Sequence, residues 1–123
     1  MSSTVARQAR AWYLQRISAM VLALCVMVHI GVIIYAVRGG LSGAEILART
    51  RGNWGFGIFY TLFVLACAVH VPIGVANIAE EWFGWTNRAA RMLFFIAGLL
   101  ILILGLRAVV GVTLGVTLGV TLP

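Results

Sequence analysis

Three long apolar runs, residues 17–37, 58–79 and 92–112, constrain this chain more than any other feature. Each run is long enough to span a membrane as a helix. A helix rises about 1.5 Å per residue, so about 20 apolar residues cross the ~30 Å hydrocarbon core of a bilayer. Because hydrocarbon offers the backbone no water, helices are the default form of such spans. The sequence therefore predicts an all-α membrane protein with three transmembrane helices.

The composition excludes a soluble domain. The chain is 63% hydrophobic and only 10% charged, with a mean hydropathy of +1.07. A soluble domain of 123 residues has a large surface and needs far more charge to cover it. A cleaved signal peptide is the competing reading of the first run, but this run is too long and no small-x-small cleavage site follows it. We expect one membrane-anchor domain over residues 1–123.

The charges predict the orientation of the chain. All nine basic residues are arginines: five lie in the N-terminal segment and the second loop, three in the first loop, and Arg107 lies in the third run. The positive-inside rule therefore favours a cytoplasmic N-terminus. Arginines on both membrane faces indicate contact with lipid headgroups, and they argue against nucleic-acid binding despite a pI of about 10.8.

Polar residues inside the runs are the most informative ones, because each costs free energy in hydrocarbon. Successive residues of a helix are turned by about 100°, which places Gly74, Asn77 and Glu81 all within about 40° of His70. These four residues form one narrow stripe along the second run. We therefore expect this stripe to face protein rather than lipid.

The first run carries a similar stripe through Ser18, Cys25 and His29, and Arg16 lies about 140° away from His29. Counted from Arg16 and from Glu81, both histidines should lie roughly 16–20 Å from the cytoplasmic ends of their helices. The sequence therefore predicts two histidines at similar depth.

Four roles are open for these histidines. Each can bond a backbone carbonyl or a hydroxyl, or relay protons, although the acidic residues lie at the helix end. Cys25, His29, Cys67 and His70 have spacings that suit tetrahedral zinc. A neutral imidazole also ligates haem iron. Haem accounts best for the surroundings of His70, because Gly74 one turn later leaves room for a flat macrocycle.

Two segments, "QRISAMVLAL" and "HVPIGVANIAEEWFGW", resemble the membrane-anchor cytochrome b subunits of succinate dehydrogenase and fumarate reductase. The resemblance covers about residues 12–110. It implies that His70 ligates haem b and that Arg16 and Ser18 lie by a quinone. It also implies that Glu81 and Trp82 border the quinone site.

The resemblance further implies an electron-transfer subunit that is not itself catalytic. One or two haems b would be shared with a second hydrophobic anchor subunit, within a multi-subunit helical bundle. An iron–sulfur subunit and a flavoprotein subunit would complete the complex in a bacterial inner (plasma) membrane, with quinone as substrate. Two-haem versions of the family take ligands from first helices, so we hypothesise that His29 ligates a second haem or the same one.

Two other functions are open, a cofactor-free structural or assembly subunit and a small transporter component. A transporter would need acidic residues or broken helices at mid-membrane, and neither is present in the sequence. The tail, residues 111–123, repeats the unit G-V-T-L three times. As helix, its glycines at positions 111, 115 and 119 would form a packing face.

Overall fold

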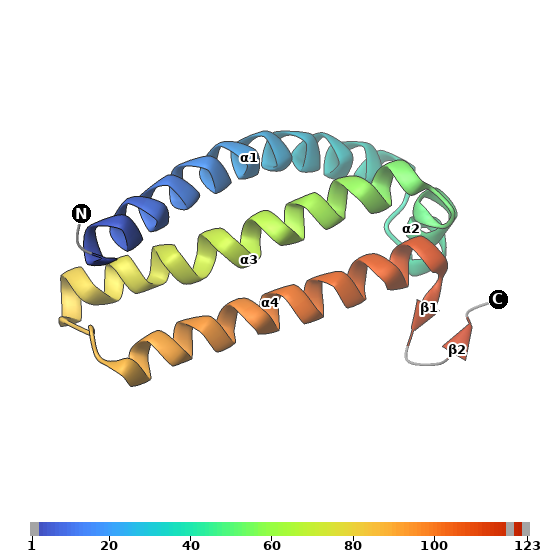
Figure 1. The fold of residues 1–123 in the computed structure, drawn as a ribbon. Coiled ribbons are helices and arrows are strands. Elements are labelled where there is room, and N and C mark those ends of the chain that lie inside the picture. The colour runs from blue at the N-terminus through green and yellow to red at the C-terminus, as the bar shows by residue number, and fades with distance from the viewer. Residues whose placement is uncertain (1–2, 118–119, 122–123) are drawn as a thin grey trace.

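The computed structural model describes residues 3–117 and 120–121. Three long helices dominate it, and α3 lies between α1 and α4 (Figure 1). The elements in chain order are α1 (Ser3–Gly39), α2 (Gly43–Thr50), α3 (Trp54–Phe83), α4 (Arg88–Leu114), β1 (Val116–Thr117) and β2 (Val120–Thr121). The prediction of an all-α membrane protein is confirmed.

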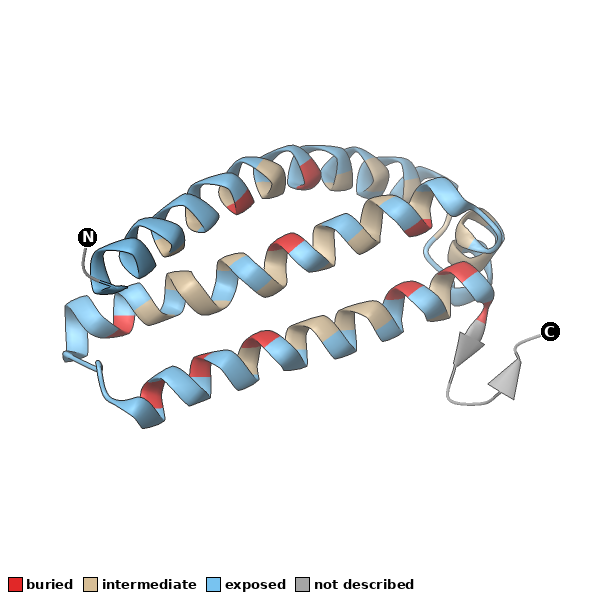
Figure 2. Ribbon diagram, viewed as in Figure 1, coloured by how far each residue is buried: buried red, intermediate tan, exposed pale blue. Residues whose placement is uncertain are grey.

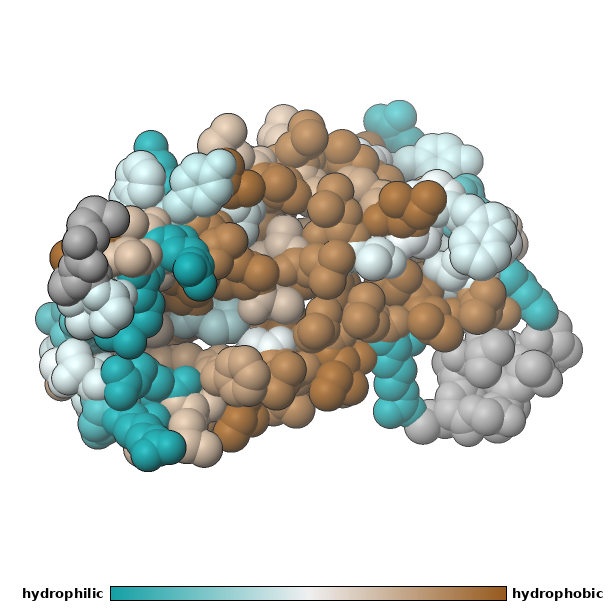
Figure 3. All heavy atoms as spheres, in the orientation of Figure 1, coloured by the Kyte–Doolittle hydropathy of each residue, from teal (hydrophilic) through white to brown (hydrophobic). Residues whose placement is uncertain are grey.

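The three long helices are each long and apolar enough to cross a membrane. Each contains one of the apolar runs and extends past it at both ends. Hydrophobic residues cover the middle of the molecule, while hydrophilic ones gather at its two ends (Figure 3). Buried residues are spread thinly along the long helices (Figure 2), as expected when most side chains face lipid or a partner chain.

The short helix α2 was not predicted. It begins with a capping box in which the Ser42 hydroxyl accepts from the Glu45 N–H at 3.3 Å, and the Glu45 carboxylate accepts from the Ser42 N–H at 2.9 Å. The Ser42 hydroxyl and the Ser42 N–H both donate to this carboxylate. These bonds, with the one from the hydroxyl as the larger cause, hold the pKa of Glu45 below its ordinary value of 4.5. The spacing S-x-x-E was the available sequence signal for this helix.

Helices α3 and α4 run antiparallel and pack closely at glycines of α4. A Cβ added at Gly105 would meet the side chain of Val64 at 2.6 Å, and one added at Gly98 would meet Cγ of Pro72 at 2.7 Å. Small residues are what let membrane helices approach this closely, since no hydrophobic effect drives helices together in lipid.

Pro72 contacts α4 through this gap. Because proline has no N–H, the Ala68 carbonyl one turn earlier loses its helical partner. That carbonyl oxygen lies 3.2 Å from the position of a Cβ on Gly98. Gly98 therefore admits both the proline ring and the freed carbonyl to the backbone of α4, so the proline has a packing role between these helices.

Gly98→Ala is expected to destabilise the packing of α3 on α4 by about 1–3 kcal/mol, because the new methyl overlaps the Pro72 ring. Thermal unfolding of the purified protein assembly measures this loss. Gly31→Ala is the matched control, since a Cβ at Gly31 meets nothing within 4 Å in the described part of the chain. Equal unfolding temperatures for the two variants would contradict this account of the interface.

The repeat tail does not continue the helix. Gly111 lies within α4, and Gly115 ends the helix with a left-handed φ of 69° and an N–H that donates to the Gly111 carbonyl. β1 and β2 then pair antiparallel, with Val116 opposite Thr121. Gly119 lies outside the described residues. The helix that a packing face through Gly111, Gly115 and Gly119 would need therefore ends at Gly115.

Candidate functional site

His70 on α3 is held by Ser18 on α1. The Ser18 Oγ lies 3.2 Å from Nδ1 of His70, and the same hydroxyl donates to the Gln15 carbonyl at 3.1 Å. Ser18 is 6% exposed. A hydroxyl has one proton to donate, so when Ser18 donates to Gln15 it accepts from His70, and a neutral imidazole in this arrangement has its proton on Nδ1. The lone pair of Nε2 is then available to a ligand.

Because Gly74, one turn after His70, has no side chain, it leaves a notch in the surface of α3, and the side chain of Gln15 fills this notch. A Cβ on Gly74 would lie 2.9 Å from Nε2 of Gln15. The other end of that amide, Oε1 of Gln15, is buried without a hydrogen-bond partner among the described residues. An unsatisfied buried acceptor costs about 1–3 kcal/mol. The Gln15 amide therefore occupies the space beside Gly74 without satisfying its own acceptor.

His29 lies at a different height from His70. Its Nδ1 is 3.1 Å from the Tyr60 hydroxyl, and its ring packs edge-on against Tyr60 and Phe63, with centroids 5.7 Å apart in each case. His29 is thus level with Tyr60, ten residues before His70, which corresponds to about 15 Å along the helix. The prediction that the two histidines share a depth is wrong, because α1 begins far earlier than its apolar run.

This separation bears on two of the predicted sites. Two ligands of one iron must both reach it, so His29 and His70, about 15 Å apart along the helix, do not fit as the pair that holds a single haem. Nor do Cys25, Cys67 and the two histidines fit one zinc ion. Within residues 3–117 and 120–121, no three His, Cys, Asp or Glu side chains group as a metal site.

The four residues predicted to bind quinone divide into two groups. Ser18 is level with His70, whereas Glu81 lies eleven residues further along α3, or about 16 Å. Arg16 is exposed, with its guanidinium 5.3 Å from the ring centre of Trp12. Trp82 is 77% exposed. Within the part of the chain that the structure describes, these residues do not form a common pocket.

Gln15 and Tyr60 were missed in the sequence. Gln15 precedes Ser18 by three residues, so its helical phase was an available signal. Tyr60 lies about 80° off the His70 stripe by phase, so periodicity would not have found it.

Comparison with protein-family models matches residues 4–116 to the succinate dehydrogenase/fumarate reductase transmembrane subunit. Neither the curated proteins nor the solved structures gave a match. The matched range contains all of α2 and α3, all of α4, and α1 from its second residue. The chain is therefore a multi-pass integral membrane protein that belongs to the family of succinate dehydrogenase/fumarate reductase transmembrane subunits.

Proposed function

We propose that this chain is the haem b-binding membrane-anchor subunit of a succinate:quinone oxidoreductase. It would pass electrons between a peripheral iron–sulfur subunit and membrane quinone. The observation that carries the proposal is the Ser18–His70 hydrogen bond, which leaves Nε2 of His70 as a ligand atom. Membership of the family supports the complex, and the residues around His70 support the haem.

Three features around His70 fit a porphyrin. The imidazole is oriented by a hydroxyl, as haem and metal ligands commonly are. Gly74 presents no side chain on the next turn. The Gln15 amide beside it is a flexible group that can leave without breaking a bond at Oε1 to any described residue. When bound, haem b would supply one-electron redox chemistry at mid-membrane.

A second hydrophobic anchor subunit would provide a further ligand to the haem and cover the far side of the site. His29 is kept as a candidate ligand of a second haem. If its Nδ1–H donates to Tyr60, as His70 donates to Ser18, its Nε2 is available in the same way.

Quinone would bind on the cytoplasmic side of His70, where Arg16, two residues before Ser18, would be a fixed cation near the level of that histidine. Trp82 lies nearer the cytoplasmic end of α3 and would act there as an N–H donor, not in one pocket with Arg16. Glu81 would relay protons to reduced quinone. Ser18 is reassigned from quinone binding to the positioning of His70, because its only proton is already donated to Gln15. An iron–sulfur subunit with its flavoprotein would cover this end, in a bacterial plasma membrane.

The test is a reduced-minus-oxidised absorption spectrum of the purified complex, with succinate as reductant. We expect a b-type α-band and haem that co-purifies with this chain. A specific observation favours a rival function: both histidines already have hydroxyl partners, as purely structural histidines do. A cofactor-free anchor predicts no α-band, and that result would refute the cytochrome.

Ser18→Ala is expected to weaken haem retention by about 10-fold, because His70 loses the acceptor that fixes its tautomer. The midpoint potential of the haem should shift as well, and a purely structural role would leave this potential unchanged. Ser18→Thr keeps the hydroxyl and should restore both values. Cys25→Ala, on the same stripe of α1, is the control. An unchanged potential in Ser18→Ala would contradict the positioning role.

A further inference from the structure

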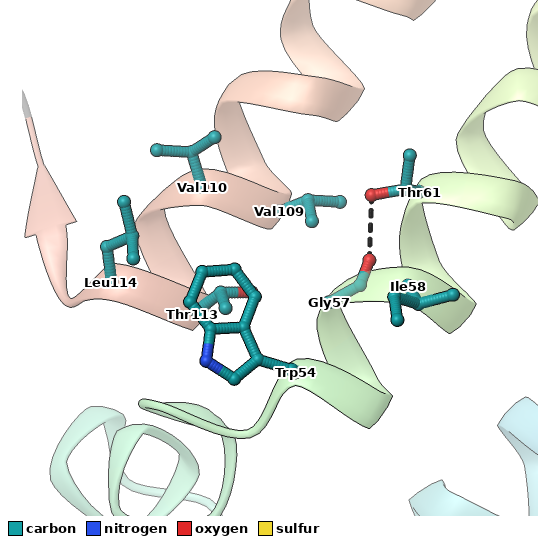
Figure 4. A pocket seen from close by; sticks show the side chains of 8 residues that line it. All are labelled: Trp54, Gly57, Ile58, Thr61, Val109, Val110, Thr113 and Leu114. Carbon is teal, nitrogen blue, oxygen red and sulfur yellow. Dashed lines mark hydrogen bonds between the residues drawn. The ribbon is translucent and has the colours of Figure 1, made fainter.

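A hollow of about 310 Å³ lies between α3 and α4, at the end of the bundle opposite to the α3–α4 loop (Figure 4). Its walls are almost entirely apolar. Ile58 is 71% exposed and Val110 is 49% exposed, so the hollow opens toward the lipid. The residues that line it are Trp54, Gly57, Ile58, Thr61, Val109, Val110, Thr113 and Leu114.

The two threonines of the hollow differ. The Thr61 hydroxyl donates to the Gly57 carbonyl at 2.7 Å, as Figure 4 shows. The Thr113 hydroxyl is buried without a hydrogen-bond partner among the described residues, and Thr113 is only 5% exposed. A buried hydroxyl without a partner costs about 1–3 kcal/mol. Thr113 therefore offers one unused donor inside an apolar hollow.

A cationic group lies beside the hollow. The segment before α3 is tied to the end of α4, because Thr50 Oγ1 donates to the Val112 carbonyl at 2.9 Å and the Gly52 N–H donates to the Thr113 carbonyl at 2.8 Å. Between them, Arg51 has its Nε 2.9 Å from the position of a Cβ on Gly115. These bonds fix the segment that carries Arg51 at the end of α4, and the Arg51 side chain lies against Gly115, the residue that follows Leu114 of the hollow.

We propose that the hollow binds one anionic phospholipid. An acyl chain lies along Ile58 and Val110, an ester carbonyl accepts from the Thr113 hydroxyl, and the phosphate faces Arg51. A single donor within an apolar slot, with a cation at its surface end, matches the order of groups along a phospholipid. A quinone has carbonyls and a tail but no anionic group to use Arg51. This site is independent of the haem proposal.

The test uses the purified complex in detergent, titrated with dibrominated phosphatidylglycerol or dibrominated phosphatidylcholine. Bromine on an acyl chain in the hollow quenches Trp54, and Trp54→Phe gives the background from other tryptophans. We expect the quenching of Trp54 to saturate at a lower concentration of phosphatidylglycerol than of phosphatidylcholine. Thr113→Val should weaken the binding of both lipids by about 5-fold, a typical loss of affinity for one hydrogen bond.

The preference for phosphatidylglycerol should disappear in Arg51→Gln. Thr86→Val, in the α3–α4 loop at the opposite end of the bundle, is the matched threonine control. Arg38→Gln, at the end of α1, is the matched arginine control. Neither control should change binding.

Two outcomes overturn the proposal. Equal binding of both lipids, with no effect of Thr113→Val or Arg51→Gln, indicates unspecific annular lipid only. Displacement of lipid by added ubiquinone, with no effect of Arg51→Gln, indicates a quinone site instead.

Discussion

His70→Ala is expected to abolish the b-type α-band of the purified complex and to release its haem. His70 supplies the iron ligand in the proposed site, so its loss should exceed the roughly 10–100-fold cost of removing a residue that only supports a ligand. The reduced-minus-oxidised spectrum, with haem and chain content measured on the same sample, records this result.

His29→Ala is the matched control variant for this experiment. Both histidines lie between α1 and α3, and both bond a hydroxyl across that interface. Because His29 is about 15 Å from His70 along α3, removing it should leave the haem at His70 in place. If the complex holds a second haem there, the band falls only in part. A wild-type spectrum in His70→Ala would show that the ligand is elsewhere.

The spans were predictable because each run satisfies a length condition that hydrocarbon imposes on any chain. The heights of side chains across the interface were not predictable. They depend on how far α1 extends before its apolar run, and residues 3–16, which form that extension, carry no strong hydropathy signal. This is why His29 pairs with Tyr60 rather than facing His70.

The facing positions of Ser18 and His70 were predicted better than the other partners, whereas Asn77 and Glu81 of the predicted α3 stripe are exposed in the structure. Phase alone placed Ser18 on the buried face of α1 and His70 on the opposing face of α3, and the structure joins them. Phase could not show that Gln15 fills the notch at Gly74, because that depends on one rotamer of a long side chain. The packing role of Pro72 could not be predicted either, since it depends on contact with Gly98 on α4.

Gly74→Leu is expected to remove haem almost as completely as His70→Ala does, by a different route. The leucine side chain would occupy the notch that the Gln15 amide now fills and that a macrocycle beside His70 would need. Haem content per complex, measured with the α-band, records the loss. Gly31→Leu is the matched control, because a Cβ at Gly31 meets no described residue within 4 Å and the variant should leave haem unchanged.

A second variant separates exclusion of haem from failure of the helices to pack. In Gln15→Ala/Gly74→Leu, the leucine can take the volume that the amide leaves, so α1 and α3 should pack and the complex should assemble. Haem should still be absent, because its place beside His70 is still filled. Gln15→Ala alone should retain haem, since the amide makes no hydrogen bond at Oε1 to the described residues. Full haem content in the double variant would show that the macrocycle does not lie over Gly74, and the imidazole would then have to present Nε2 to a different face of the interface.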